Sequence, residues 1–268
     1  MNIQQKLASI RIGIERKTGK PNLSSEDERH VLTENSVTKS NALCRAYYRF
    51  NIVEKRVMES MISQLDPRAY NQYQTQDVEL RAVDYAKAFG VSEKSAYREL
   101  ESALDALLKR VITVEDAKKV TKRPLMFRAD YIKKEGRMVA SFHPELLEHL
   151  IGLRERFASY PLLEAVSFKS SYTWRFYELM MSWAQDKRKT GGLLAGWFTV
   201  DVNEFREMMG FPKSMNFALM RERVIERSQS ELLETANIHL SAEYIKRGRK
   251  ITHIKFEFIE DEQQKLAL

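Results

Sequence analysis

AVDYAKAFG at residues 82–90 and DVNEFREMMG at residues 201–210 follow the same plan. Each is a short helical stretch that ends on a lone glycine, and Gly90 and Gly210 stand 120 residues apart. A few turn residues follow each glycine, and a second helical stretch with basic side chains comes next. The chain therefore contains the same local pattern twice.

Two helices joined by a tight glycine turn form the helix-turn-helix unit, whose second helix fits the major groove of DNA. A single match carries little weight, because helix pairs with a glycine turn are common in protein cores. Two matches in the same context favour DNA binding. Ser92 is suited to cap the second helix of the first copy, and Asp201 with Glu204 forms a capping box at the start of the second copy.

Strand-like runs surround both copies. In the first half the predicted strands are residues 78–82, 111–114, 125–128 and 138–142, with basic or polar turns at 118–123 and 133–137. In the second half they are residues 197–200, 237–244 and 251–259. A hairpin after a helix-turn-helix is a wing, so each half has the order helix, strand, helix, turn, helix, wing.

These patterns predict an α+β protein made of two tandem winged-helix domains related by pseudo-duplication. We expect a flexible N-terminal arm over residues 1–36, a first domain over 37–158, a second over 159–260 and a tail over 261–268. Helical periodicity predicts further helices near residues 53–65, 144–153, 170–184 and 215–235, and a short one within the arm.

The composition favours an anionic partner. Lys and Arg (44) outnumber Asp and Glu (37), which gives a net charge of +7 at pH 7, and binding to phosphates is strengthened by the release of counterions. A basic soluble protein without such a partner would have the same composition. Cys44 is the only cysteine, so no disulfide can form within the chain. No run approaches the roughly 18 apolar residues of a membrane span, and we expect a cytoplasmic protein without membrane contact.

The second helix of the second copy carries the strongest candidate site. At 100° per residue, Asn216, Arg223 and Arg227 fall within an arc of roughly 40°, away from the apolar stripe. Arginine pairs with guanine and asparagine with adenine in the favoured base contacts. Lys213 and Ser214 lie at the predicted helix start, where the positive end of the helix dipole favours phosphate.

A structural explanation of the same face stays open, in which Glu222 and Glu226 pair with the arginines and the face is only solvated. In the first copy, Lys94, Ser95 and Arg98 occupy the first turns of the second helix. Acidic residues follow them, so only the N-terminal end of that helix is expected to approach DNA.

Three basic loops are predicted to contact phosphates, which position a protein on DNA without reading its sequence. The first contributes Lys118, Lys119, Lys122 and Arg123. The second comprises residues 187–189. The third, at the second wing, contributes Lys246, Arg247, Arg249 and Lys250. Solubility alone is an alternative reason for basic loops.

Catalysis has little support in the sequence. The five histidines are scattered without the spacing of a zinc helix, and there is no cysteine pair. Residues 13–20 depart from a phosphate-binding loop in spacing, and Pro21 replaces the required Ser or Thr. Tyr47-Tyr48 lacks the histidine partners of a nicking tyrosine pair. We therefore expect no enzymatic activity, no metal and no cofactor.

Several segments together resemble the iteron-binding initiators of theta-type plasmid replication, the RepE, π and RepA class. They are VTKSN (37–41), YAKAFG (85–90), LIGL with the following Arg156-Phe157 (150–157), SYTWRFYE (171–178), and KRGRK with the following THI (246–254). No single segment is diagnostic, but their order and spacing extend from about residue 37 to 259. The resemblance covers nearly all of the predicted folded part.

This resemblance implies a DNA-binding protein with two states. A monomer would bind direct repeats, or iterons, at a replication origin, and a dimer joined through the first domain would bind an inverted repeat and repress its own gene. Arg221 and Arg223 match positions that contact bases in the family, although Glu222 interrupts the more basic run of some members. The resemblance also implies recruitment of host replication proteins and chaperones.

The sequence leaves two alternative functions to compare with this one. A tandem winged-helix transcription regulator without a role in initiation would share every fold pattern, because a fold does not determine a function. A nuclease or relaxase would need clusters of metal ligands that the sequence does not contain.

Overall fold

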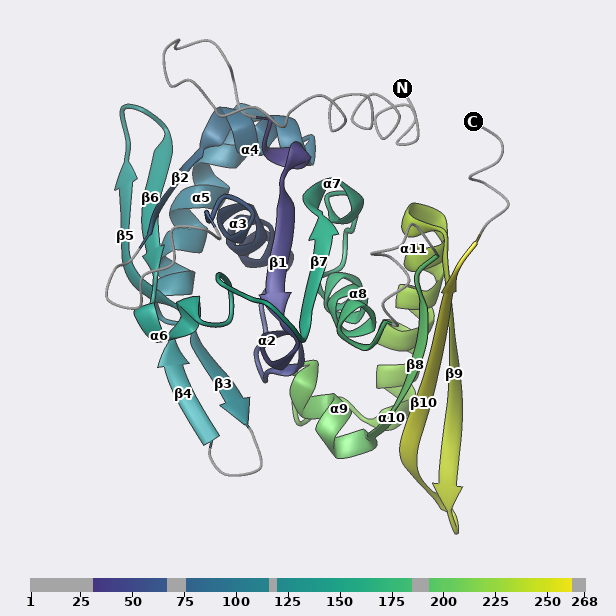
Figure 1. The fold of residues 1–268 in the computed structure, drawn as a ribbon. Helices are drawn as coiled ribbons and strands as arrows, with labels where there is room; N and C mark the ends of the chain where they lie inside the picture. The colour runs from purple at the N-terminus through teal and green to yellow at the C-terminus, as the bar shows by residue number, and fades with distance from the viewer. Residues whose placement is uncertain (1–30, 67–75, 116–119, 185–192, 262–268) are drawn as a thin grey trace.

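The computed structural model describes residues 31–66, 76–115, 120–184 and 193–261. Two winged-helix domains lie side by side, and a two-stranded sheet joins them in the middle of the molecule (Figure 1). Residues 1–30 of the expected arm, with its short predicted helix, and residues 262–268 of the tail lie outside the described residues.

The first domain has the predicted helix-turn-helix and a three-stranded sheet in the order β2-β6-β5. Its helices are α3 (Ile52–Ile62), α4 (Ala82–Phe89) and α5 (Glu93–Leu108). Its strands are β2 (Asp77–Arg81), β5 (Met126–Ile132) and β6 (Arg137–Phe142), and the hairpin of β5 and β6 is the wing.

The second domain repeats this order. Its helices are α8 (Ser171–Trp183), α9 (Val202–Met208) and a continuous helical run made of α10 (Phe217–Met220), η3 (Arg221–Glu226) and α11 (Arg227–Ala236). Its strands β8 (Ala195–Asp201), β9 (Ile238–Arg247) and β10 (Lys250–Glu260) form a sheet in the order β8-β10-β9. The β9–β10 hairpin is the second wing and reaches beyond the helices of its domain (Figure 1).

A strand precedes each domain, and the two strands pair with each other. β1 (Ser36–Ser40) runs antiparallel to β7 (Phe157–Pro161), with Thr38 opposite Ser159 at the centre of the ladder. Short helices accompany them, namely η1 (Leu32–Glu34), α2 (Asn41–Arg45), α6 (Pro144–Leu147) and α7 (Leu162–Ala165). Because an antiparallel pair is symmetric about its midpoint, the ladder lies where a pseudo-twofold axis would relate the two halves.

Local sequence explains how the helices begin and end. Asn51 and Glu54 form a complete capping box at the start of α3, and Ser92 and Asp201 accept backbone N–H groups at the starts of α5 and α9. Gly90 ends α4 in the left-handed conformation at φ 64°, which glycine adopts without steric cost. The caps predicted at Ser92 and Asp201 are confirmed.

Gly210 is also left-handed, at φ 63°, but it has a second constraint. A Cβ at this position would lie 2.6 Å from Arg49 Cβ and 3.1 Å from Tyr48 O. Arg49 belongs to the first domain and Gly210 to the turn of the second, so the two domains meet closely here. The same addition at Gly90 would meet no atom within 4 Å.

The strand pattern of the first half differs from the prediction. Residues 118–123 were predicted to be a turn of the wing, but Val120–Pro124 forms β4, which pairs with β3 (Val111–Glu115) in a separate two-stranded hairpin. The predicted strands are present, but β3 pairs with the unpredicted β4 instead of the strand predicted at 125–128.

Three helix and boundary predictions also change. The closing helix predicted over 144–153 is only the four-residue α6, which Glu148 ends. The long helix predicted from about 215 to 235 begins at Phe217 and contains the π-helical segment η3. The folded part begins before residue 37, because η1 buries Leu32. The boundary expected at 158/159 falls inside β7 and stays a prediction.

Buried charges fill the contact between the domains. The side chains of Lys39 in β1, Glu59 in α3 and Glu178 in α8 are fully buried. Lys39 Nζ lies 2.9 Å from Glu59 Oε1 and also donates to Glu178 Oε1. One ammonium therefore connects the first helix of each domain.

Further donors surround the two carboxylates. Lys55 Nζ lies 2.7 Å from Glu59 and 2.6 Å from Glu178. Arg175 on α8 donates to Tyr48 Oη at 2.7 Å and to Ala46 O at 2.6 Å, both in the first domain. Unpaired buried charge is costly, so these groups stabilise one packing of the two domains only while they remain together.

Candidate nucleic-acid interface

The α10–η3–α11 run is the second domain's recognition helix. Its inner face buries Met220, Val224, Ser228 and Leu232, which includes most of the predicted stripe. Arg221, Glu222 and Arg223 lie on the exposed side. The packing therefore leaves a basic segment of this helix accessible to a ligand.

The two exposed arginines of this segment differ in their surroundings. Arg221 Nε lies 3.0 Å from Glu226 Oε1, a pair five residues apart that the π-helical turn brings together. Within the described part of the chain, no ion pair involves Arg223. The structure thus realises the alternative of internal charge pairing for Arg221 and leaves Arg223 available.

Asn216 does not lie on the predicted arc. It is the N-cap residue, and its Oδ1 accepts the backbone N–H of Leu219 at 2.9 Å, so it stands before the first helical turn. Lys213 and Ser214 are exposed in the turn that precedes this cap, not at the helix start. The prediction placed the helix start about two residues too early.

Arg227 is exposed and lies four residues after Arg223. It lines a groove between the domains, together with Arg49 and Arg110 of the first domain. Its place on one arc with Arg223 stays a prediction.

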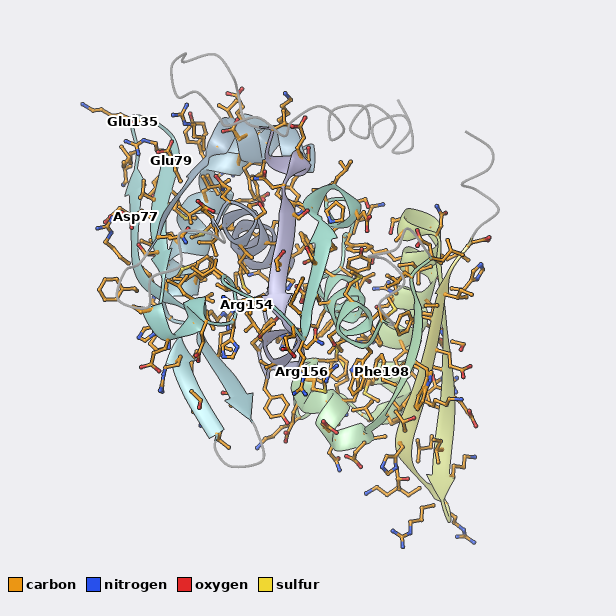
Figure 2. The ribbon with its side chains drawn as sticks, viewed as in Figure 1. Asp77, Glu79, Glu135, Arg154, Arg156 and Phe198 are labelled. Carbon is orange, nitrogen blue, oxygen red and sulfur yellow. The ribbon has the colours of Figure 1, made fainter. Side chains whose placement is uncertain are left out.

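The second wing presents its predicted cations as expected. Lys246, Arg247, Arg249 and Lys250 are all exposed at the hairpin tip, where Gly248 has φ 65°. None of the four takes part in an ion pair with a described residue. Figure 2 shows side chains projecting from this tip beyond the rest of the domain, which suits contact with a backbone alongside a groove.

In the first domain, α5 presents Lys94 and Arg98 on its exposed surface near its N-terminal end. The Ser95 hydroxyl is within hydrogen-bond distance, 2.9 Å, of Ser92 Oγ. The wing turn packs close to this end, because a Cβ at Gly136 would overlap the ring of Tyr97. Lys133, in the same turn, is 81% exposed, but its Nζ lies 3.6 Å from Glu101 Oε1, so its charge is paired.

The first basic loop is placed elsewhere. Lys122 and Arg123 belong to β4, which follows the opposite end of α5 from Lys94, and Arg123 pairs with Glu145. They are therefore separate from the wing to which they were assigned. Lys118, Lys119 and the patch at 187–189 lie outside the described residues.

Acidic side chains mark another surface of the first domain. Figure 2 places Asp77, Glu79 and Glu135 along the outer sheet. Asp77 lies 2.8 Å from Arg128, and Glu79 lies 2.8 Å from Arg81. Cations on this sheet are neutralised locally, which distinguishes it from α5 and from the second wing.

Comparison with protein-family models matches both halves of the chain. The description "Initiator Replication protein, WH1" covers residues 36–181, and "Initiator Rep protein, WH2" covers residues 201–258. This chain belongs to the initiator replication protein family. The first match of this initiator extends through β7 into α8, and the second contains the whole recognition helix and most of the wing.

Two solved structures are similar to the initiator, and the first of them supports the same fold. The crystal structure of the Pi initiator protein in complex with iteron DNA is 19% identical, with a TM-score of 0.68, and the match covers 88% of this chain and 100% of that one. The WH1 domain of MSBI1.176, isolated from a multiple sclerosis patient, is 15% identical, with a TM-score of 0.28 over 41% of this chain and 78% of that one. The Pi structure shares the paired winged-helix architecture.

Membrane-spanning helices and metal-binding clusters are both absent from the initiator's described residues. No helix there is both long and apolar enough to cross a membrane. No group of three or more His, Cys, Asp and Glu side chains there is arranged to hold a metal ion.

Sequence reasoning did not select Arg49, Arg110 and Lys169 as site residues, because residues this far apart in sequence are brought together only by the packing of the domains.

Proposed function

We propose that this protein initiates plasmid replication by binding direct repeats at an origin as a monomer, through both winged-helix domains. The observation that carries the proposal is the accessible basic surface of the second domain, where Arg223 on the recognition helix and four cations at the wing tip have no acidic partners among the described residues. A helix for the major groove beside a wing for the backbone is the arrangement that sequence-specific binding requires.

A solved structure of a similar protein bound to DNA supports DNA as the ligand. The Pi initiator has the same fold and is bound to iteron DNA. Two recognition helices in successive major grooves would span about two helical turns, each roughly 34–36 Å. The binding energy would be used to bend and locally open the duplex, and no catalytic step is part of this proposal.

Repression of its own gene by a dimer is a further part of the proposal. One feature of the first domain supports self-association there: β4 pairs with β3 on one side, and Val120 in β4 and Val111 in β3 are 56% and 51% exposed. An edge strand with exposed apolar residues is a template for pairing with a second copy. The family resemblance further supports recruitment of host replication proteins and chaperones.

The test is a footprint of the purified protein on the DNA that flanks its own gene, at two salt concentrations and several protein concentrations. Protection of several direct repeats of about two helical turns each is the expected result. Protection of a single inverted repeat alone would favour a transcription regulator. Salt-sensitive binding without a preferred site would contradict both functions.

Arg223 provides a prediction for the site itself. Replacing Arg223 by Ala should weaken binding to the cognate repeat by about 1–3 kcal/mol and relax the preference at one base pair, because a bidentate contact to a base would be lost. Binding is measured by fluorescence anisotropy on the repeat and on its single-base variants. Arg128→Ala, which removes an arginine already paired with Asp77, is the matched control. Unchanged affinity and base preference in Arg223→Ala would remove this residue from the interface.

A further inference from the structure

A groove of about 590 Å³ opens at the surface between the two domains. One wall comes from the first domain, with Arg49 and Asn51 at the start of α3 and Arg110 just after α5. The other comes from the second domain, with Lys169 before α8 and Arg227 in α11. Neither domain alone forms this groove.

The lining of the groove is cationic. It contains four basic side chains and no acidic one. Arg49, Lys169 and Arg227 are exposed, and no described carboxylate pairs with any of them. Arg110 is held by two hydrogen bonds to Glu54, at 2.7 and 2.8 Å. Three like charges without counterions in one groove repel one another and are relieved by a bound anion.

Several other polar groups of the groove are already engaged. The Asn51 side chain caps α3, and Ser170 Oγ accepts the N–H groups of Tyr172 and Thr173 at the start of α8. The backbone N–H groups of Lys169 and Ser170 donate to Glu231. The Asn51 and Ser170 side chains are therefore occupied in capping, whereas the exposed cationic side chains remain free to meet phosphate.

The position of Arg227 indicates which phosphates these are. Arg227 follows η3 directly and is four residues from Arg223, so the groove adjoins the helix that the proposed function places in the major groove. Arg110 follows the recognition helix of the first domain. The groove thus lies between the two helices that would occupy successive major grooves.

We propose that this interdomain groove binds the DNA backbone phosphates that lie between the two major-groove contacts. The inference rests on the proposed function and adds a third contact region to it. Because the cations come from both domains, a backbone held in the groove also favours one relative orientation of the domains.

The test uses the full chain and the repeat identified by footprinting, with a non-cognate duplex of equal length. In the double variant Arg49→Gln/Lys169→Gln, each lost phosphate contact should reduce the slope of log K against log salt by roughly 0.9, so the shift is nearly two. Affinity should fall by the same factor on both duplexes, because backbone contacts carry no sequence information. The control Arg81→Gln/Arg128→Gln removes two arginines that are paired on the outer sheet and should leave the slope unchanged.

Ethylation interference locates the contact. Ethylation of phosphates between the two protected major grooves should block binding of the wild-type protein and no longer affect the double variant. Equal thermal midpoints of the two proteins show that the fold is retained. A wild-type slope and interference pattern in the double variant would overturn the groove assignment while leaving sequence-specific binding intact.

Two other outcomes are separable from this one. Absence of any protected repeat with the wild-type protein would contradict the proposed function itself. Calorimetric titration of the DNA-free protein with ATP tests a small anionic ligand. Micromolar binding that the double variant loses would assign the groove to a nucleotide and overturn its assignment to DNA phosphates.

Discussion

Glu59 and Glu178 occupy equivalent places in the two domains. Each is the eighth residue of the helix that opens its winged-helix unit, α3 or α8. Both carboxylates accept hydrogen bonds from the ammonium groups of Lys39 and Lys55, and both lie within 3.3 Å of the Tyr160 hydroxyl. The duplication has therefore placed two buried carboxylates close together, and the lysines of the first domain compensate their negative charges.

The pKa of Glu59 leads to a prediction about acid stability. Burial alone would raise this pKa, but Lys39 and Lys55 hold it below its usual 4.5. The ionised group therefore contributes stability above pH 4.5, and this contribution is lost as the pH falls through the lowered folded-state pKa. Glu59→Gln should cost about 3–5 kcal/mol at pH 7, because it leaves buried cations uncompensated, and should reduce the loss of stability as the pH falls below 4.5.

Urea unfolding at pH 7 and at a series of pH values below 4.5 measures this effect. Glu155→Gln, at an exposed glutamate, is the control and should retain the wild-type dependence on pH. An equal acid-induced loss of stability in Glu59→Gln and wild type would show that Glu59 does not carry this linkage.

Single residues were predicted well where their role depends on local sequence. The caps at Ser92 and Asp201 and the exposed cations of the second wing follow from neighbouring residues alone. Asn216 was placed inside the helix because the prediction started the helix at about residue 215, whereas Asn216 is its N-cap. The buried Lys39 has no local signal, because its two partners are 20 and 139 residues away.

At the scale of elements, the two ends of the β9–β10 hairpin have different roles. One end packs in the core of the domain, and the other end is exposed for ligand binding. Its buried residues, such as Ile254 and Phe256, lie in the half nearer the helices, while Lys246–Lys250 at the tip are exposed. Changes at the tip should therefore act on ligand binding and leave the core of the domain unaffected.

Replacing Lys246, Arg247, Arg249 and Lys250 together by Gln should leave the thermal midpoint almost unchanged. The magnitude of the salt slope of DNA binding should fall by roughly 0.9 for every one of the four that contacts a phosphate. Differential scanning fluorimetry and anisotropy titrations at four salt concentrations provide the two measurements. Lys255→Gln, which removes a cation of the same hairpin that is already paired with Glu257, is the control and should keep the wild-type slope. A normal slope in the fourfold variant would exclude the wing from the interface.

Element types were predicted more reliably than strand partners. Hydrophobic periodicity identified α3, α5 and α8 and most strands, because their apolar residues recur at regular spacing, although residues 173–182 of α8 are buried on every side. The pairing of β3 with β4 was missed because β4 is the basic segment VTKRP, which alternates between exposed and half-buried positions without an apolar face. Its strand character comes from hydrogen bonding to β3, which a reading of side chains does not detect.

At the scale of the whole molecule, the two duplicated glycines have different constraints. Both lie in strained turns, but only Gly210 also lies in a contact between the domains. Both have φ near 64°, so an alanine at either position costs about 1–2 kcal/mol of backbone strain. At Gly210 the added methyl group would also overlap Arg49 of the first domain, which adds about 1–3 kcal/mol.

Gly210→Ala should therefore be less stable than Gly90→Ala by about 1–3 kcal/mol, as measured by chemical unfolding of the two variants. Arg49→Gly in the Gly210→Ala background removes the Cβ that is overlapped and should recover part of the difference. Equal stabilities of the two glycine variants would mean that the domains do not meet at Gly210 in solution. The duplication itself was predicted from sequence, but this contact was not, since the turn pattern is the same in both copies.

The β1–β7 ladder limits how far this protein can be divided. Each of the two strands has five residues, and each has the other as its ladder partner. A cut between the domains would expose a row of unsatisfied N–H and C=O groups on each piece and open the site where Lys39 joins the two glutamates. Strands freed in this way tend to find the same strand on another molecule. Excised halves should therefore self-associate rather than behave as independent modules.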